Sequence, residues 1–590
     1  MTSPHAPSSR THSRRAVLRS GAWAAGGLLL AACVLDDDDS AGDETGVRIA
    51  PASRNEARAT ATGPPEATAT ASPSPPPAPT SSLLSAAQEA LEGERGILRR
   101  GVVGEAVPSP ALTQARLVAV DPRGGDIHGD LALSVEQAGP LELIVRLRPD
   151  AFFHPAPGAS AGAPVDAAAV ARDFERRAQA REFLFAGVLD TIETPRADTL
   201  LLRLNAPFAL LFELLGDTAV AAVRAEGLAE FGQPVGAGPF IAERLEDGGV
   251  SLRPHGRYHH DDLPLLDEVR IVSAEREQAL DAAFEAGAID VHVLNQPDSV
   301  VRAEQREGAR VLTRSTRRAR GLGLSLVGTK DGRRVRFHPA FQDERVRRAL
   351  FQALDYERIA AREGSGADYP AGPVSAAFGT DALPRFELAA HPLFSHDPAE
   401  ARRLLAAAGV TDLAFSLEAP DRAPFTTLVL VLLRQLQEGG FRPRLNIVSD
   451  EQWRRDLARG DFEAILFELE PVRTPDTGLR LHSTAGLDDF SPWGYSNPLY
   501  DEAVAEALSA LDPVERGRRA REAQRLLLDD VPALVPLPEP VERVAVSSRI
   551  LGYAWRAYEF NQTWQAARWR IRSPGETRAP GPAGSSGVAL

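Results

Sequence analysis

The sequence predicts a protein of mixed α/β or α+β class, and three observations support this. Helix-like and strand-like segments alternate from about residue 141 to residue 550, which is the pattern of these two classes. The length of 590 residues suggests several domains, and 43% hydrophobic residues supply enough apolar surface for their cores. No repeat with a period of about 20 to 50 residues is visible, so neither a solenoid nor a propeller is expected.

The expected elements of the first half begin with a short helix at residues 83–91. Asp166 is placed to cap a helix that buries Val170 and Phe174. A Gly-rich turn is expected at residues 236–240. The other expected elements are strands at residues 141–147, 199–204, 269–272 and 310–313, a turn or short helix at 207–215, and a helix at 276–286.

The second half opens with a helix expected over residues 341–359. For the next helix, Asp397 supplies a cap, Pro398 a first-turn proline and Glu400 an early acidic residue, and the helix stops at Gly409. The remaining expected elements are helices at residues 425–438, after Asn497 and after Asp512, and strands at residues 413–417, 444–448, 462–469, 535–537 and 543–546.

The N-terminus has the layout of a secretion signal: a basic start, an apolar middle and small residues at its end. Arg14-Arg15 resembles a twin-arginine signal, and Leu30-Ala31-Ala32-Cys33 resembles a bacterial lipobox with an acylated cysteine. A membrane-spanning helix is the alternative, but only residues 22–32 are continuously apolar or Gly, and a span needs about 20 apolar residues. We therefore expect residues 1–33 to be a lipoprotein signal, with lipidation at Cys33 and the body outside the cytoplasm.

Two further segments lack the composition of a folded domain. Residues 34–82 cannot bury enough apolar surface to offset the entropy of ordering, so we expect a disordered tether, and residues 573–590 form a Pro- and Gly-rich tail.

The net charge of −15 argues against nucleic acid, whose binders need a basic face. Cys33 is the only cysteine, which excludes an internal disulfide and a thiolate metal cluster.

Several short stretches share their order and spacing with one known family. Residues 147–154 read LRPDAFFH, similar to the family's LRPGVKFHDG, and residues 397–409 are similar to its DPEKAKKLLAEAG. The other matching stretches are residues 164–170, 235–240, 257–258, 286–290 and 343–355. Taken together, residues 141–550 resemble the family 5 extracellular solute-binding proteins, which are the peptide-binding and nickel-binding components of ABC importers.

The resemblance implies a periplasmic-binding-protein-like fold of type II, in which two α/β lobes close over a cleft about a hinge. Lobe I would comprise residues 83–324 and 481–572, and lobe II residues 325–480. The implied protein is a monomer without catalysis, cofactor or bound metal. It would capture a peptide or another small polar solute and deliver it to an ABC permease in the membrane.

Two departures from the family pattern leave a second function open. The segment before residue 147 is shorter than in the family, and its early SLDP stretch is not recognisable. Where peptide-binding members carry an acidic residue that pairs with the peptide amine, this chain has Leu469 to Arg473. Glu470 could supply that acid, whereas Arg473 would oppose a cation. The alternative is therefore a sensor or structural lipoprotein that keeps the fold without cargo.

Aromatic side chains are the other ligand candidates. Trp493 and Tyr495 lie where the chain should return past the cleft, and Trp453 resembles a cleft-side tryptophan of the family. Their amphipathic rings suit stacking on a ligand, but packing between the lobes explains them equally well. His482 is a further candidate cleft residue.

Two patterns suggest other chemistry but have ordinary explanations. Residues 158–162 fit the G-x-S-x-G motif of a hydrolase, yet the surrounding prolines indicate a loop and not the strand–turn–helix that the motif needs. His255, His259 and His260, with Asp261 and Asp262, have spacing that could ligate a metal. We expect these five residues instead to form a solvated turn, so no metal site is expected. Because the G-x-S-x-G stretch lies in a loop, a secreted hydrolase is the least favoured alternative.

Overall fold

A computed structural model describes residues 96–120, 127–156, 158–330, 332–362, 371–469, 474–486, 491–553 and 565–572. The predicted signal with Cys33, the tether, the helix at residues 83–91, the C-terminal tail, and the residues Glu470 and Arg473 lie outside these ranges. Among the described residues, no helix combines the length and the apolar composition needed to cross a membrane.

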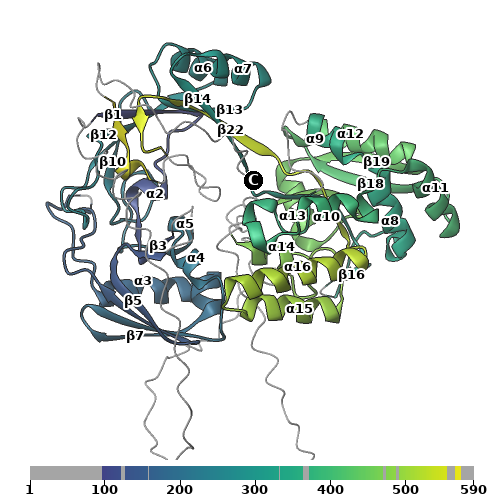
Figure 1. Cartoon of the computed structure of the whole chain (residues 1–590), viewed down its shortest axis with the longest axis horizontal. Helices are drawn as coiled ribbons and strands as arrows, with labels where there is room; N and C mark the ends of the chain where they lie inside the picture. The colour runs from purple at the N-terminus through teal and green to yellow at the C-terminus, as the bar shows by residue number, and fades with distance from the viewer. Residues whose placement is uncertain are drawn as a thin grey trace, which may run out of the picture. The chain divides into compact units, whose positions relative to one another are not determined.

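A seven-stranded mixed sheet forms the first part of the fold (Figure 1). β1 runs parallel to both β12 and β13, while β22 pairs antiparallel with β13 and β14. Its strands, in spatial order, are β10 (Phe240–Arg244), β11 (Val250–Pro254), β12 (Glu268–Ala274), β1 (Ile97–Val103), β13 (Val291–Leu294), β22 (Val541–Ser547) and β14 (Ala309–Ser315). Helices α6 (Glu277–Glu285) and α7 (Pro297–Gln305) pack against β13 and β14. The strands predicted at 269–272, 310–313 and 543–546 and the helix at 276–286 are confirmed.

A four-stranded antiparallel sheet follows, in the order β5 (Ala132–Gly139), β6 (Glu142–Leu147), β8 (Thr199–Leu204) and β7 (Leu189–Arg196). Helix α3 (Ala167–Gln179) begins as predicted: the Ala169 N–H donates to Asp166 Oδ1 over 2.7 Å, and Val170 and Phe174 are fully buried. Short elements connect this sheet to the rest: α2 (Pro110–Thr113), β2 (Ala115–Arg116), β3 (Val118–Val120), β4 (Ile127–Gly129), α4 (Leu211–Leu215), α5 (Thr218–Ala221) and β9 (Ala222–Val223).

A five-stranded mixed sheet forms the second part, in the order β19 (Phe441–Val448), β18 (Leu413–Pro420), β20 (Ala464–Leu469), β15 (Ala319–Leu324) and β21 (Leu534–Pro536). β18 runs parallel to β19 and β20, and β15 runs antiparallel to β20 and β21. Its helices are α8 (Glu344–Ala353), α9 (Tyr356–Arg362), α10 (Arg385–Ala390), α11 (Pro398–Ala407), α12 (Phe425–Glu438), α13 (Asp450–Arg459), α14 (Pro475–Arg480), α15 (Pro498–Ser509) and α16 (Pro513–Asp529).

Most of the predicted helices of this part are confirmed, with one correction. Asp397 caps α11 by accepting from the N–H groups of Ala399 and Glu400, over 3.0 and 2.8 Å. The single helix predicted at 341–359 is wrong, because α8 ends at residue 353 and α9 starts at residue 356. Asp355 breaks the helix there: its carboxylate accepts from the Arg358 N–H over 2.9 Å and caps the new helix.

The division between the two parts differs from the predicted one. One continuous apolar core runs from Leu322 to Leu537 and includes residues of α15, α16 and β21. The prediction assigned these elements to lobe I, beyond residue 480. They belong to the second part because β21 pairs with β15 and the helices bury their apolar faces in the same core. We call residues 319–537 the second region and the described residues before 316 and after 540 the first region.

Two short segments, residues 316–318 and 538–540, therefore connect the regions. The Thr316 hydroxyl donates to Pro540 O over 2.8 Å. Beside it, Arg314 Nη2 lies 2.7 Å from Glu542 Oε2, so the two crossing segments are tied together on the first region's side. Paired connections of this kind are the hinge of a two-lobed binding protein.

Candidate functional site

A small cavity of about 40 Å³, lined mostly by apolar residues, lies where both crossing segments enter the second sheet. β15 and β21 supply one wall, and residues 371–378 and 478–482 supply the others. Its polar lining consists of Arg318, Arg320, Ser375, His482 and Glu539. The cavity thus collects groups from segments far apart in the chain at the base of the hinge.

An ion pair between neighbouring strands starts at the cavity wall, where Arg320 is one of the lining residues. Arg320 in β15 and Glu468 in β20 are register partners, and Arg320 Nη2 lies 2.6 Å from Glu468 Oε2. Their side chains are 1% and 0% exposed, so neither charge is solvated by bulk water. Arg318 Nη1 reaches the other oxygen of Glu468 at 3.3 Å and remains 33% exposed. A buried carboxylate needs such partners, because an uncompensated charge in the interior is strongly destabilising.

The opposite wall is attached to the crossing segments. The Ser375 hydroxyl donates to Glu539 Oε2 over 2.6 Å. Arg317 donates to Ala377 O over 2.9 Å and stacks over the Phe378 ring at 4.2 Å. Burial lowers the pKa of Arg317 to about 9, and the nearby charge of Glu539 acts in the opposite direction. A solute that contacts this wall would therefore act on both crossing segments.

His482 gives the cavity a neutral imidazole. Burial lowers its pKa to about 3, so the ring carries no charge at neutral pH. A neutral ring offers one donor and one acceptor. With the guanidinium groups, the carboxylates and the Ser375 hydroxyl, the site brings groups of both charges to one small cavity. The candidate role of His482 in a cleft, raised from the sequence, is consistent with this position.

The predicted aromatic residues lie elsewhere. Trp493 is 1% exposed, its Nε1–H donates to Leu481 O over 3.0 Å, and its ring packs on Phe462 and Phe467. A Cβ on Gly323 would lie 2.0 Å from this indole, so β15 needs glycine there for the ring to pack against the strand. Trp493 therefore packs inside the second region and not between the lobes, which was the alternative to ligand stacking.

Trp453 and Tyr495 are likewise enclosed. The Trp453 Nε1–H donates to Leu466 O over 3.0 Å, and the Tyr495 hydroxyl lies 2.5 Å from Asp530 Oδ2. Neither residue lines the cavity, so their predicted ligand contact stays a prediction, as it does for Glu470 and Arg473. Sequence reasoning missed Arg320 and Glu468, although a charged residue within each of two apolar strands was a signal that the two might pair.

A larger cavity of about 560 Å³ lies beside α3 in the first region. Its charged lining is balanced: Asp173 pairs with Arg176 at 2.6 Å and accepts from the Arg224 N–H over 3.0 Å. The predicted loop at residues 158–162 runs past it, and a Cβ on Gly162 would lie 1.6 Å from Phe153 O. Close backbone packing therefore explains this glycine, and the strand–turn–helix setting of a nucleophile is not formed.

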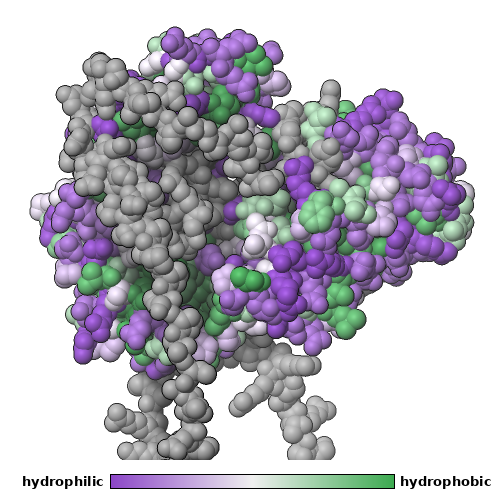
Figure 2. Space-filling model, in the orientation of Figure 1, coloured by the Kyte–Doolittle hydropathy of each residue, from purple (hydrophilic) through white to green (hydrophobic). Residues whose placement is uncertain are grey.

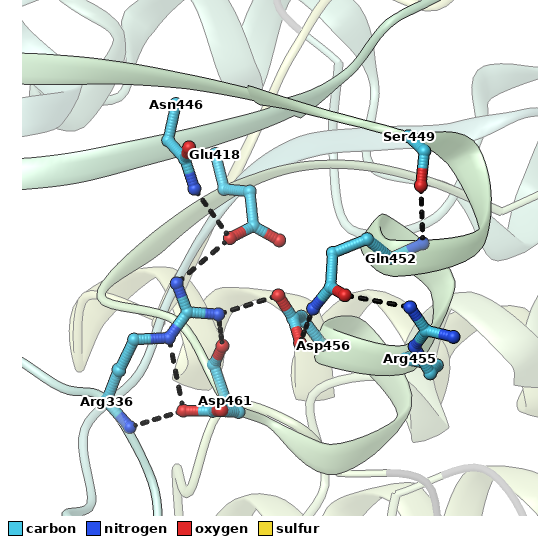
Figure 3. Close-up of polar contacts among 8 residues, drawn as sticks. All are labelled: Arg336, Glu418, Asn446, Ser449, Gln452, Arg455, Asp456 and Asp461. Atoms are coloured by element: carbon cyan, nitrogen blue, oxygen red, sulfur yellow. Dashed lines mark hydrogen bonds and ion pairs between the residues drawn. The ribbon is translucent and has the colours of Figure 1, made fainter.

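A third polar group lies at the carboxyl ends of β18 and β19, which are parallel (Figure 3). Asn446 Nδ2 and Arg336 Nη1 both donate to Glu418 Oε2, over 3.3 and 3.2 Å, and Arg336 also contacts Asp456 and Asp461. Burial raises the pKa of Glu418 to about 7, and the charge of Asp456 adds to this. The network fixes residue 336 against the second sheet.

The predicted solvated turn at residues 255–262 is wrong for two of its histidines. His255 and His259 are buried, whereas Asp261 and Asp262 are exposed. Gly236 and Gly238 shape the neighbouring turn as expected, because a Cβ on either would collide with the backbone of Thr113.

Comparison with known proteins decides the family. The model of the bacterial extracellular solute-binding proteins, family 5, middle part, matches residues 126–485. The chain belongs to this family. The glutathione-binding protein GsiB of Salmonella paratyphi A is 23% identical over 420 residues, which cover 66% of this chain and 77% of GsiB.

Solved structures of the family confirm the two-lobed fold of type II. DppA from Helicobacter pylori, in complex with the peptide STSA, gives a TM-score of 0.66 at 19% identity and covers 82% of this chain and 99% of its own. NikA from Staphylococcus aureus, in complex with Ni(L-His)2, gives 0.60 at 18% identity and covers 81% and 100%. The chain is a family 5 solute-binding protein of extracytoplasmic type and not an enzyme.

Proposed function

We propose that this family 5 protein is the substrate-binding component of an ABC importer. It is held at the membrane by lipidated Cys33, captures a peptide or another small polar solute in the cleft between its lobes, and delivers it to the permease as a monomer. The names of its relatives support this cargo class, since they include a glutathione-binding protein and a complex with a peptide.

The observation that carries the proposal is the group of charged and polar side chains where the crossing segments enter the second sheet; the cavity of about 40 Å³ among them has room for one end of a peptide and not for the whole molecule. The lining includes Arg318 of one segment and Glu539 of the other, together with Ser375 of the second region. A solute that binds these groups differently in the open and closed forms would shift the balance between them, which is how occupancy can be signalled to a permease.

The charges of the cavity favour a solute that carries both a carboxylate and an amine. Arg318 is the accessible guanidinium, and Glu468 and Glu539 are the carboxylates near it. Peptides and amino-acid conjugates have this pair of charges, and an arginine is suited to bind a carboxylate through two parallel hydrogen bonds.

Ligand screening with a matched variant tests the proposal. Purified protein is expected to gain thermal stability with one of a panel of di- and tripeptides, glutathione, nickel–histidine chelates and oligosaccharides. Arg318→Ala should weaken that binding at least tenfold. Arg348→Ala is the control, because Arg348 is also 33% exposed and also pairs with a glutamate, but lies on α8 away from the cavity lining. Equal losses in both variants would contradict the site.

The anchor is tested separately. Cells that express Cys33→Ala should release the protein from the membrane fraction and lose incorporation of labelled fatty acid. If this variant stayed in the membrane fraction as the wild type does, lipidation at Cys33 would be excluded.

The second candidate is a sensor or structural lipoprotein without cargo. The pairing of Arg320 with Glu468 and the burial of Trp453 and Trp493 favour it, because these groups already have partners within the chain. A complete ligand panel without any thermal shift, together with no small molecule released on denaturing the purified protein, would favour this candidate over transport.

A further inference from the structure

One carboxylate and two imidazoles converge outside the cavity described above. His259 Nε2 lies 2.7 Å from Asp130 Oδ1, and His260 Nε2 lies 3.5 Å from the same oxygen. One ligand atom from each of the three residues lies within 4.8 Å of the others. The His259 side chain is fully buried, that of Asp130 is 11% exposed and that of His260 is 23% exposed. The group is therefore buried on one side and reachable from solvent beside His260.

The carboxylate is held in place by the backbone around it. Asp130 Oδ2 accepts from the Arg116 N–H over 3.1 Å, and the Asp130 N–H donates to Leu117 O over 3.0 Å. The guanidinium groups closest to it are directed to backbone carbonyls: Arg116 Nε donates to Val118 O and Arg148 Nε donates to Asp130 O. These bonds fix Asp130 Oδ1 toward the two imidazoles.

The histidines are fixed by the turn that carries them. The Tyr258 N–H donates to His255 O over 2.9 Å, and the Leu263 N–H donates to His260 O over 3.0 Å. The Tyr258 ring packs on His259 and His260, with centroids at 4.4 and 5.4 Å. The 2.7 Å contact with the carboxylate places the ring proton on His259 Nε2, because an ionised carboxylate only accepts. An ion that binds Nε2 would displace this proton, either to solvent or to His259 Nδ1, which has no partner among the described residues.

A second cluster in the same region, formed by Glu277, Asp281 and His292, also brings possible ligand atoms within 4.8 Å of one another, but its carboxylate has more donors. His292 Nε2 lies 2.9 Å from Asp281 Oδ1, while Asp281 Oδ2 accepts from Ser299 Oγ over 2.6 Å and from Arg302 Nη2 over 3.0 Å. Arg302 already supplies the positive charge, and each carboxylate oxygen has its own donor. At Asp130, by contrast, one oxygen faces two imidazole nitrogens, and the distance of 3.5 Å to His260 is too long for a good hydrogen bond.

We propose that Asp130, His259 and His260 bind one divalent transition-metal ion, such as Zn²⁺ or Ni²⁺. Two imidazole nitrogens and one carboxylate oxygen are a donor set that these ions prefer, and a fourth position toward His260 would be open to water. Ligand atoms about 2.0–2.2 Å from a tetrahedral ion lie about 3.3–3.6 Å apart, which the 3.5 Å pair already matches. The 2.7 Å pair has to open slightly, through rotation of the carboxylate or of the His259 ring.

The ion would join two cores of the first region. Asp130 precedes β5 of the four-stranded sheet, and Leu131 and Ala132 belong to the core of that sheet. The histidines follow β11 of the seven-stranded sheet, whose core is a separate cluster that includes Leu252 and Leu266. Coordination across the two would add a link where no continuous apolar core exists, and this role is independent of the cargo site.

Titration of the full chain, produced without a polyhistidine tag and treated with EDTA, tests the proposal. Isothermal titration with ZnCl2 and NiCl2 should show one site, elemental analysis should find one equivalent after desalting, and the ion should raise the midpoint of thermal unfolding. His260→Ala should weaken binding at least tenfold, and it should unfold at the same temperature as the metal-free wild type because its ring is partly exposed.

His292→Ala is the matched control, since it removes a histidine from the cluster at Asp281, where Arg302 already pairs with the carboxylate, and should leave ion binding unchanged. Asp130→Asn, checked by circular dichroism, is the second variant and should also lose binding. A wild type without a saturable site, or a His260→Ala protein that binds the ion as tightly as the wild type, would overturn the proposal.

Discussion

The two regions are held together in different ways. The second region has one apolar core that extends without interruption from Leu322 to Leu537. The first region has three separate cores, one on the four-stranded sheet and two on the seven-stranded sheet. A polar contact joins the core of the four-stranded sheet to the larger core of the seven-stranded sheet: His259 Nε2 lies 2.7 Å from Asp130 Oδ1.

This difference predicts how each region should respond to a destabilising substitution. A continuous core couples all the elements around it, so removing a buried side chain from it should destabilise the whole region. Separate cores allow local opening, and their connection depends on a few polar groups and on close backbone approaches. Figure 2 is consistent with a well-solvated exterior for the second region, because hydrophilic residues dominate the visible surface over α15 and α16.

The largest effect is expected from removing a large side chain in the second core. Trp493→Ala should lower the free energy of unfolding by about 3–5 kcal/mol, as Trp or Phe truncation in a core usually does. Hydrogen exchange measured by mass spectrometry should show lost protection throughout residues 319–537. Trp569→Ala, which empties a fully buried site in the first region, should expose only the seven-stranded sheet. Loss of protection in both regions from either variant would contradict the comparison.

The buried ion pair gives the next largest effect. Arg320→Ala removes the closest charge partner of the buried Glu468, with Arg318 still 3.3 Å away, and should cost about 3 kcal/mol in urea denaturation. Replacing both residues, with Arg320→Met and Glu468→Leu, should recover most of that loss. The exposed pair of Arg203 and Glu142 in the first region is the control, and Arg203→Ala should not shift the urea midpoint.

The pH dependence of the second region should come in part from Glu418. Its pKa is raised to about 7 from an unperturbed 4.5, chiefly by burial. The folded state therefore holds a proton that the unfolded state releases, and this contribution is full below pH 4.5 and lost as the pH rises through 7. Glu418→Gln should remove the slope and stabilise the protein at pH 8 by about 2 kcal/mol. An unchanged slope of unfolding free energy between pH 5 and pH 8, about the range of this titration, would exclude Glu418 as its source.

The smallest effect should be equal in the two regions. Asp397→Ala removes the cap of α11 in the second region, and Asp166→Ala removes the cap of α3 in the first. Each should cost about 1 kcal/mol in urea denaturation, because a cap acts on its own helix and not through the core. A markedly larger loss at either position would show that the cap also supports tertiary packing.

The sequence by itself determined the local structure and the family. Caps such as Asp166, Asp397 and Asp512 act on N–H groups within three residues, so their pattern is visible in the chain and was confirmed. The family motifs lie in the same way on contiguous stretches. The break at Asp355 was missed because an acidic residue inside an apolar pattern is compatible with a continuous helix as well as with a new cap.

Only the tertiary structure decided the sites and the division into regions. Arg320 and Glu468 are 148 residues apart, and Asp130 and His259 are 129 apart, so only the sheet order and the loop packing bring them together. The assignment of α15 and α16 to the second region depends on the pairing of β21 with β15. The two tryptophans show most clearly what a local pattern cannot predict. A tryptophan that stacks on a ligand and one that packs in a core look the same in the sequence, and only the tertiary structure shows that Trp453 and Trp493 are buried in the core.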